Sequence, residues 1–218
     1  MRSDSEIQRD VEAELAWTPG LNETDIAVKV SDSIVTLTGY AANYAEKYRA
    51  EAAAKRVLGV AAVANDLAVR TPLGGMPTDP EIAREAVTAL KIELPIHWEQ
   101  IRPIVHEGHV ALEGTAEWHD QRERAEAAVR RVQGVMSVRN SIKLKRHAQP
   151  QEDIKHNIEE AFRRNAIIDA QRVSVQIHGG EVILRGQVSS WAEREQARRA
   201  AWAAPGVSVV KDELVVRT

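Results

Sequence analysis

The sequence predicts an α+β protein made of three tandem α-β-β-α-β repeats, each a three-stranded mixed sheet covered on one face by two helices. Two observations carry this prediction. Glycines recur in pairs with the same internal spacing, and apolar residues keep one register around each pair. Self-similarity at a fixed period is typical of repeat architectures. The pairs, which we assign to the fold rather than to function, are Gly39 and Gly59, Gly114 and Gly134, and Gly186 and Gly206.

The repeats divide the 218-residue chain into predicted domains at 1–72, 78–147 and 150–218. Residues 72–77, between the first two domains, are rich in Pro and Gly and are the expected hinge. A unit of roughly 70 residues buries only about 60% of its unfolded surface, so it is marginally stable alone. We therefore expect the repeats to pack against one another or against a second copy of the chain.

Each repeat opens with an amphipathic helix. Apolar residues four apart lie on one face of a helix. Ser3 with Glu6, and Thr78 with Glu81, have the spacing of a capping box, in which side chains satisfy free N–H groups of the first turn. The apolar stripes are Ile7/Val11/Leu15, Ile82/Ala86/Leu90 and Ile154/Ile158/Phe162.

A β-hairpin follows the helix. Apolar residues recur at every second position over 26–30, and the equivalent segments of the other repeats have the same period, which predicts a first strand. A tight turn at 31–33 leads to a return strand that carries Val35 and Leu37. Pro103 has no N–H to donate to a ladder, so the first strand of the second repeat is expected at a sheet edge.

A second helix and a third strand complete each repeat. The pairs Asn43/Glu46 and Ser190/Glu193 mark helix starts, and the second glycine of each pair is expected to end the helix as a left-handed cap. Residues 63–69 and their equivalents form the third strand. Small residues on the inner face let this helix approach the sheet closely: Ala50/Ala53/Val57, Ala125/Ala128/Val132 and Ala197/Ala200/Ala204.

A motif at the end of every repeat points to a known family. Gly-Val-x-x-Val-x-Asn/Asp-x-Leu begins at Gly59, and its counterparts begin at Gly134 and Gly206, with Ile142 replacing the leucine in the second repeat. With the α-β-β-α-β order, this motif resembles the BON domain in three tandem copies, as in the osmotically inducible periplasmic protein family. The resemblance implies a non-enzymatic module that attaches to phospholipid or other envelope components, often in osmotic stress.

Composition excludes several classes of site. The chain has no cysteine, which removes disulfides, thiolate metal sites and cysteine nucleophiles. No apolar run approaches the roughly 18 residues that cross a bilayer, and no hydrophobic stretch follows Arg2. We expect no membrane span and no signal peptide. The expected location is cytoplasmic for the chain as written, and periplasmic if a leader was removed.

The remaining chemical signals are weak. His106, His109 and His119 suggest zinc, but the first two straddle a hairpin turn, so we expect no metal and no cofactor. No Gly-x-Ser-x-Gly nucleophile motif is present, and we expect no enzyme activity. The net charge is −3 and no Gly-x-x-Gly loop occurs, so we expect no nucleic-acid partner.

The sequence therefore favours a non-enzymatic binding protein that docks on anionic phospholipid or an envelope-associated protein partner in osmotic or general stress. Trp202 aligns with Lys55, which suggests an outward position. Two alternatives stay open: a chaperone-like or self-associating scaffold, and a module that responds to potassium or calcium through backbone carbonyls. The residues assigned to lipid or partner contact are Trp17, Arg130, Arg131, Lys145, Arg146 and Trp202.

Overall fold

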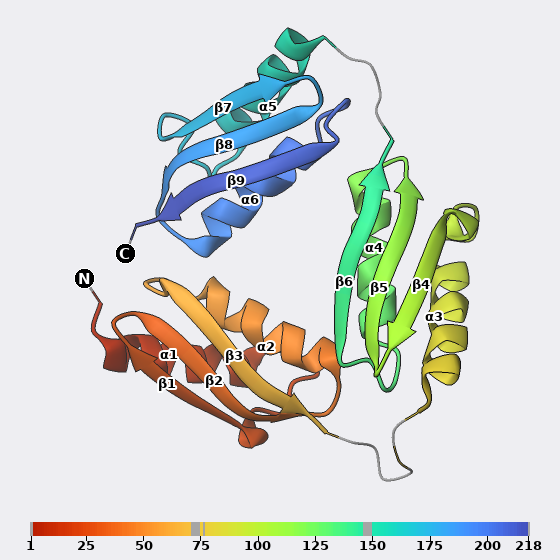
Figure 1. Cartoon of the computed structure of the whole chain (residues 1–218). Coiled ribbons are helices and arrows are strands. Elements are labelled where there is room, and N and C mark those ends of the chain that lie inside the picture. The colour runs from red at the N-terminus through yellow and green to blue at the C-terminus, as the bar shows by residue number, and fades with distance from the viewer. Residues whose placement is uncertain (1, 71–74, 76, 146–149, 218) are drawn as a thin grey trace.

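The computed structural model describes residues 2–70, 75, 77–145 and 150–217, and over them the predicted fold is confirmed (Figure 1). Each repeat holds one three-stranded sheet with two helices on one face. The strand orders are β1-β2-β3, β4-β5-β6 and β7-β8-β9. The predicted hinge at 72–77 lies outside the described residues, apart from residues 75 and 77.

The three repeats have the same element order. The first contains α1 (Asp4–Trp17), a short 3-10 turn (Glu23–Asp25), β1 (Ile26–Ser31), β2 (Ile34–Ala41), α2 (Tyr44–Arg56) and β3 (Ala62–Val69). The second contains α3 (Asp79–Glu93), a 3-10 turn (Trp98–Gln100), β4 (Ile101–His106), β5 (His109–Ala116), α4 (His119–Arg130) and β6 (Ser137–Leu144). The third contains α5 (Gln151–Arg164), β7 (Val173–His178), β8 (Glu181–Val188), α6 (Trp191–Trp202) and β9 (Val209–Val216).

The sheets are mixed because the chain crosses over only once in each repeat. The hairpin pairs β1 antiparallel to β2, and α2 then carries the chain back so that β3 runs parallel to β2. The same pairing holds in the other two repeats. The hairpin's return strand is therefore central in every sheet. Pro103 lies in β4 at a sheet edge, as expected.

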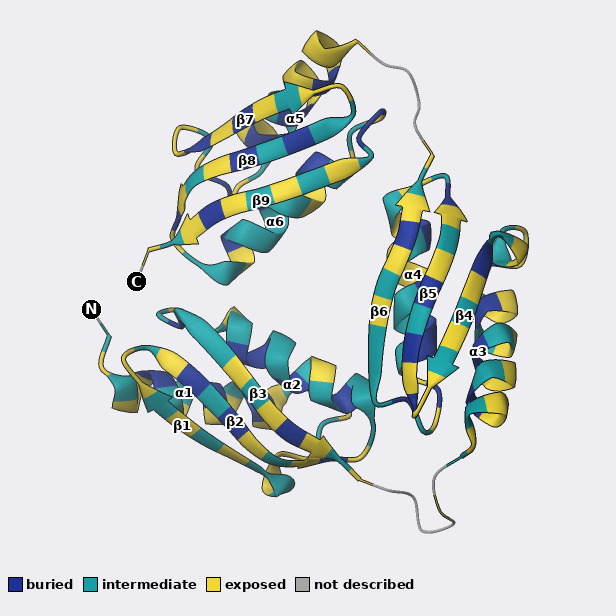
Figure 2. Ribbon diagram, viewed as in Figure 1, coloured by how far each residue is buried: buried dark blue, intermediate teal, exposed yellow. Residues whose placement is uncertain are grey.

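Each repeat has its own core between the helices and the sheet (Figure 2). The apolar stripe of the first helix is fully buried in every repeat, as in Ile7, Ile82 and Ile158. The second helix contributes alanines, and Ala50, Ala125 and Ala197 are each 0% exposed. The small side chains let this helix lie close to the sheet.

The first residue of the opening helix also holds the hairpin turn. The Asp79 carboxylate accepts hydrogen bonds from the backbone N–H groups of Glu107 (2.8 Å) and Gly108 (3.0 Å), and Asp4 holds the first hairpin in the same way. The turn residues have left-handed backbone conformations, which suits a two-residue hairpin turn. Helix and hairpin are thus locked together by one side chain.

A buried polar residue fixes the start of each second helix. Glu46, Gln121 and Glu193 occupy equivalent positions and are 5%, 9% and 2% exposed. The Glu193 carboxylate accepts from the backbone N–H groups of Asp169 (2.9 Å) and Ser189 (2.7 Å), so it joins the loop before β7 to the turn after β8. The predicted cap is also present, because Ser190 Oγ accepts from Glu193 N.

The glycines serve geometry in two ways. At Gly114, with φ of +127°, a Cβ atom would lie 1.9 Å from the Gln100 carbonyl oxygen, because β5 passes close to the entry of β4. The prediction that the second glycine ends the helix is wrong. The helix α2 ends at Arg56, and Gly59 adopts its φ of +94° in the following turn, so that Val60 can enter the core.

Replacing Gly114 with valine is expected to lower stability by about 4 kcal/mol, the upper range for single substitutions, because side chain and carbonyl would overlap. Gly179→Val is the control: its φ is +62° but its Cβ position meets nothing within 4 Å. We expect only the left-handed strain there, about 1–3 kcal/mol. Thermal melts measure both. Equal losses in the two variants would contradict the close-contact explanation.

The Asp79 contact predicts a pH-dependent stability. The backbone N–H groups of Gly108 and Glu107, with smaller contributions from His106 and His109, lower the pKa of Asp79 below its ordinary value. A lowered folded pKa contributes stability above the unfolded pKa of about 3.9, and this stability is lost as pH falls through the folded pKa.

Asp79→Ala should therefore melt below the wild-type protein at pH 7, with the difference shrinking below about pH 4. Glu85→Ala, an exposed change of the same charge on α3, is the control and should show no such trend. Melting temperatures across pH 2.5–7 decide the point, and a difference that stays constant with pH would contradict it.

Candidate contact surfaces: the inter-repeat ring and the basic sheet face

The three repeats are arranged around a common centre, with β3, β6 and β9 as the innermost strands (Figure 1). The second helices α2, α4 and α6 meet there in a head-to-tail cycle: the start of each one contacts the end of another. Head-to-tail contacts of this kind close into a ring when the rotation between units permits. We call this set of contacts the inter-repeat ring, and it contains three junctions.

The junction between the third and first repeats is built on Trp191, the first residue of α6. Its indole N–H donates to the Ala61 carbonyl oxygen at 3.2 Å, and its ring packs against the core of the first repeat. Lys55, near the end of α2, places Nζ 5.2 Å from the ring centroid, and Arg194 lies 4.8 Å from it. An aromatic anchor and one cation from the partner repeat, Lys55, therefore join these repeats, and Arg194 supports the ring from within its own helix.

The junction between the second and third repeats is a ring stack. His119, the first residue of α4, stacks on Trp202, the last residue of α6, with centroids 4.0 Å apart and planes 5° apart. The Arg122 guanidinium lies 5.4 Å from the Trp202 centroid. A hydrogen bond with His119 is the main cause that lowers the pKa of Glu123. The charges of Arg198 and Arg199, across the junction, lower it further.

The junction between the first and second repeats again joins a ring near the start of one second helix to a cation at the end of another, as the Trp191 junction does. Arg130, the last residue of α4, places its guanidinium 3.6 Å from the ring centroid of Tyr48 in α2. Tyr44, the first residue of α2, packs against the core of the second repeat. Glu126 pairs with Arg130 and holds it in place. Aromatic and cationic groups therefore form all three junctions of the inter-repeat ring.

Sequence reasoning missed this ring, although the aligned repeats contain a signal for it. The first position of the second helix is a ring side chain in every repeat: Tyr44, His119 and Trp191. The last aligned position is a long cation or a tryptophan: Lys55, Arg130 and Trp202. Three aromatic residues at a polar helix start indicate a contact outside the repeat itself.

A second surface lies on the open face of the second sheet, opposite the helices. Arg102, Arg139 and Lys143 are exposed there, and none has an ion-pair partner within the described residues. Lys145 continues the row beyond β6 and pairs with Glu117 at 2.6 Å. Glu113 lies opposite Arg102 in the sheet and is the acidic residue of this strand face. We call this surface the basic sheet face.

Apolar groups accompany these charges. Ile104 is 51% exposed on β4, in the same cross-strand row as Arg139. Trp118 is 50% exposed at the start of α4 and follows the residue that pairs with Lys145. Tryptophan and aliphatic side chains beside cations are typical of surfaces that meet a membrane interface.

The open faces of the other two sheets differ in charge. Small residues occupy outward positions in the first repeat, including Ala27, Ala64 and Ala68. In the third repeat two basic side chains of this face are paired: Arg185 with Glu213 at 2.6 Å, and Lys211 with Glu181. Among the described residues, the open face of the second repeat therefore carries three unpaired cations, whereas that of the first repeat carries Lys29.

The structure separates the residues assigned to partner contact. Trp17 lies at the end of α1 and is 83% exposed, and Arg131 is exposed after α4. Lys145 belongs to the basic sheet face. Arg130 lies in the inter-repeat ring. Arg146 falls outside the described residues.

Trp202 does not have the freely outward position that its alignment suggested. Its ring packs partly on the third repeat's own core and is covered by His119 of the second repeat. The alignment with Lys55 places Trp202 at the end of the second helix, at the margin of its repeat. It could not show that another repeat occupies that margin.

The histidines do not converge. His106 and His109 face each other across the hairpin, whereas His119 stacks in the ring. Over the described ranges, no group of three or more His, Cys, Asp or Glu side chains is placed to hold a metal ion. Nor does any helix in those ranges have the length and apolarity needed to cross a membrane.

Fold and surfaces together define a tandem array of small α-β-β-α-β modules joined through their second helices. The model of the BON domain matches all three, at residues 3–71, 78–146 and 150–218. The chain therefore belongs to the BON-domain family and carries three copies of the domain, as the resemblance in its sequence indicated.

Relatives are consistent with this assignment. "Osmotically-inducible protein Y" of Escherichia coli (strain K12) is 34% identical over 148 residues, covering 65% of this chain and 73% of the relative. Two solved structures of CdsD, a structural protein of the type III secretion system of Chlamydia trachomatis, share 15% and 14% identity with it. The matches cover 97% and 100% of this chain and 92% and 100% of the other chains, at TM-scores of 0.27 and 0.26.

The ring makes Trp191 the expected anchor between the first and third repeats. Trp191→Ala should weaken that junction by about 2 kcal/mol, the usual threshold for an anchor residue, and increase the radius of gyration while helix content stays the same. Small-angle scattering and circular dichroism measure these. Trp17→Ala, at an exposed position, is the control. An unchanged radius for Trp191→Ala would contradict the anchoring role.

Proposed function

We propose that this BON-domain protein is a non-enzymatic binding protein that docks on anionic phospholipid through the basic sheet face of its second repeat. The observation that carries the proposal is the set of exposed, unpaired cations on one open sheet: Arg102, Arg139 and Lys143, with no ion-pair partner within the described residues. A cation near an anionic bilayer surface contributes about 1 kcal/mol to binding.

The shape of the surface supports a membrane as the partner. An open β-sheet presents its cations in rows on one side, so several can reach a flat anionic surface at once. Ile104, 51% exposed in the same cross-strand row as Arg139, supplies an apolar group beside those charges. Such groups enter the headgroup region of a bilayer and add apolar burial to the charge attraction.

Two further observations support this proposal, one on the absence of a catalytic role for the buried carboxylates and one on osmotic stress. The buried carboxylates Glu46 and Glu193 accept backbone N–H groups and so serve the fold. The name of the relative, osmotically-inducible protein Y, supports a place in the response to osmotic stress. We infer that docking is used under such stress.

The test is flotation with vesicles of phosphatidylcholine alone and with added phosphatidylglycerol, at low and moderate salt. We expect binding to the anionic vesicles only, weakened by salt, since screening reduces charge attraction. Lys143→Glu should lower the partition coefficient at least about fivefold, the equivalent of roughly 1 kcal/mol per lost cation.

Lys29→Glu is the matched control, because it makes the same charge change on the open face of the first repeat, where Lys29 is exposed. It should bind nearly as the wild-type chain does. Equal losses in both variants would show that net charge and not the basic sheet face governs binding. No flotation at any composition would overturn the lipid proposal and favour the protein-scaffold alternative.

A further inference from the structure

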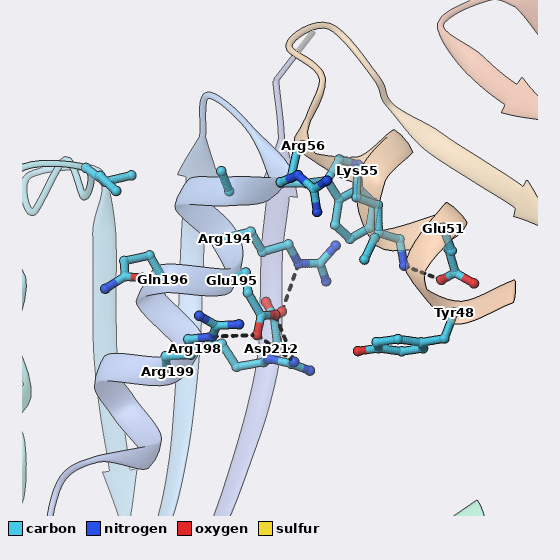
Figure 3. A pocket seen from close by; sticks show the side chains of 14 residues that line it. Tyr48, Glu51, Lys55, Arg56, Arg194, Glu195, Gln196, Arg198, Arg199 and Asp212 are labelled. Atoms are coloured by element: carbon cyan, nitrogen blue, oxygen red, sulfur yellow. Dashed lines mark hydrogen bonds and ion pairs between the residues drawn. The ribbon is translucent and has the colours of Figure 1, made fainter. Parts of the chain in front are cut away.

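A cavity of about 600 Å³ lies between α2 and α6, beside the Trp191 junction (Figure 3). Its walls come from the first and third repeats, so neither repeat forms it alone. The volume is within the range of sites for small organic molecules, roughly 300–1,000 Å³. The cavity is distinct from the basic sheet face of the second repeat and does not depend on lipid docking.

Positive charge exceeds negative charge in the lining. Five cationic side chains face three carboxylates: Lys55, Arg56, Arg194, Arg198 and Arg199 against Glu51, Glu195 and Asp212. Glu195 accepts from both Arg198 at 2.8 Å and Arg199 at 3.2 Å, so one carboxylate balances two guanidiniums. Asp212 is committed to Arg194 at 2.8 Å.

Charges just outside the lining reduce this excess but do not remove it. Glu14 pairs with Arg56 from the α1 side at 2.7 Å. On the α4 side, Glu123 lies near Arg198 and Arg199, but Arg122 adds a further guanidinium there. An excess of positive charge therefore stays in the cavity. Two neighbouring guanidiniums match the geometry of a phosphate group, which they can hold through parallel hydrogen bonds.

Aromatic groups form the other part of the lining. The Trp191 N–H already donates to Ala61. Lys55 and Arg194 lie 5.2 Å and 4.8 Å from the Trp191 ring centroid, so a ligand meets only the part of the ring that lines the cavity. Tyr48 extends from α2 into the space between the helices, with its hydroxyl toward α6 (Figure 3). Ile167 adds an aliphatic surface. Flat aromatic bodies stack on such rings.

From this combination we infer that the cavity binds a small organic anion with a flat aromatic body, of the mononucleotide class. The guanidiniums of Arg198 and Arg199 receive the phosphate, and Tyr48 and Trp191 contact the base. Inorganic phosphate alone would leave most of the volume unfilled. Because its walls belong to two repeats, an occupied cavity holds the first and third repeats together.

The test titrates the full chain with adenosine monophosphate by calorimetry and follows the melting temperature. Adenosine and inorganic phosphate, at matched ionic strength, are the separate arms. We expect the mononucleotide to bind and to raise the melting temperature, as any ligand of the folded state does. Adenosine alone and inorganic phosphate alone should each bind at least tenfold more weakly than the mononucleotide.

Arg199→Gln is the test variant, since its side chain is 66% exposed and Arg198 still pairs with Glu195 when it is removed. It should weaken mononucleotide binding at least tenfold with an unchanged melting temperature in the absence of ligand. Arg131→Gln, the same change at an exposed position after α4, should bind as the wild-type chain does.

Three results would overturn the inference. The first is the absence of mononucleotide binding at millimolar concentration. The second is equal binding of inorganic phosphate and mononucleotide, which would remove the aromatic part. The third is equal affinity of Arg199→Gln and the wild-type chain, which would place any binding elsewhere.

Discussion

A repeat of roughly 70 residues can remove only about 60% of its unfolded surface from water, and this limit shapes the molecule at each level. Inside a repeat, alanines on the second helix let it approach the sheet closely, and Gly114 and its equivalents let the hairpin pass close to the chain before it. Buried acceptors such as Glu193 then hold the loops on which this packing depends. The apolar surface that a single repeat cannot bury is covered by contacts between repeats.

The junctions of the inter-repeat ring are formed by aromatic side chains and cations. In a larger protein a continuous apolar core would hold such units together. Trp191 enters the first repeat, Trp202 is covered by His119, and Tyr48 is covered by Arg130. Contacts of this kind contribute about 0.5–2 kcal/mol each, so each junction is weak alone. Closure of the cycle makes them act together, since opening one junction lets the neighbouring repeats move apart.

Ring closure also divides the surfaces by role. Second helices face inward, so the cavity between α2 and α6 exists only when the first and third repeats meet. Open sheet faces stay outside, where the second repeat presents Arg139 and Lys143 to solvent. One set of repeats thereby offers two chemically different surfaces, a concave one with aromatic rings and a flat one with unpaired cations.

The local pattern of side chains along the sequence was sufficient to predict the fold of a single repeat. Helix stripes, strand alternation and the edge position of Pro103 follow from side-chain periodicity and backbone donors, which act over a few residues. The helix end before Gly59 did not follow, because the burial of Val60 decides it. Nor did the sequence show that Arg124 and Lys145 are paired, since their partners Glu93 and Glu117 lie about 30 residues away in the chain.

The sequence by itself determined that three BON modules follow one another, each with its own helices, hairpin and buried stripe, because those features depend on near neighbours in the chain. Only the tertiary structure decided which second helix meets which, that Trp202 lies under His119, and where cations of different repeats come together. Those outcomes depend on the rotation between repeats, and this rotation is determined by contacts between residues such as Trp191 and Ala61 that are 130 positions apart.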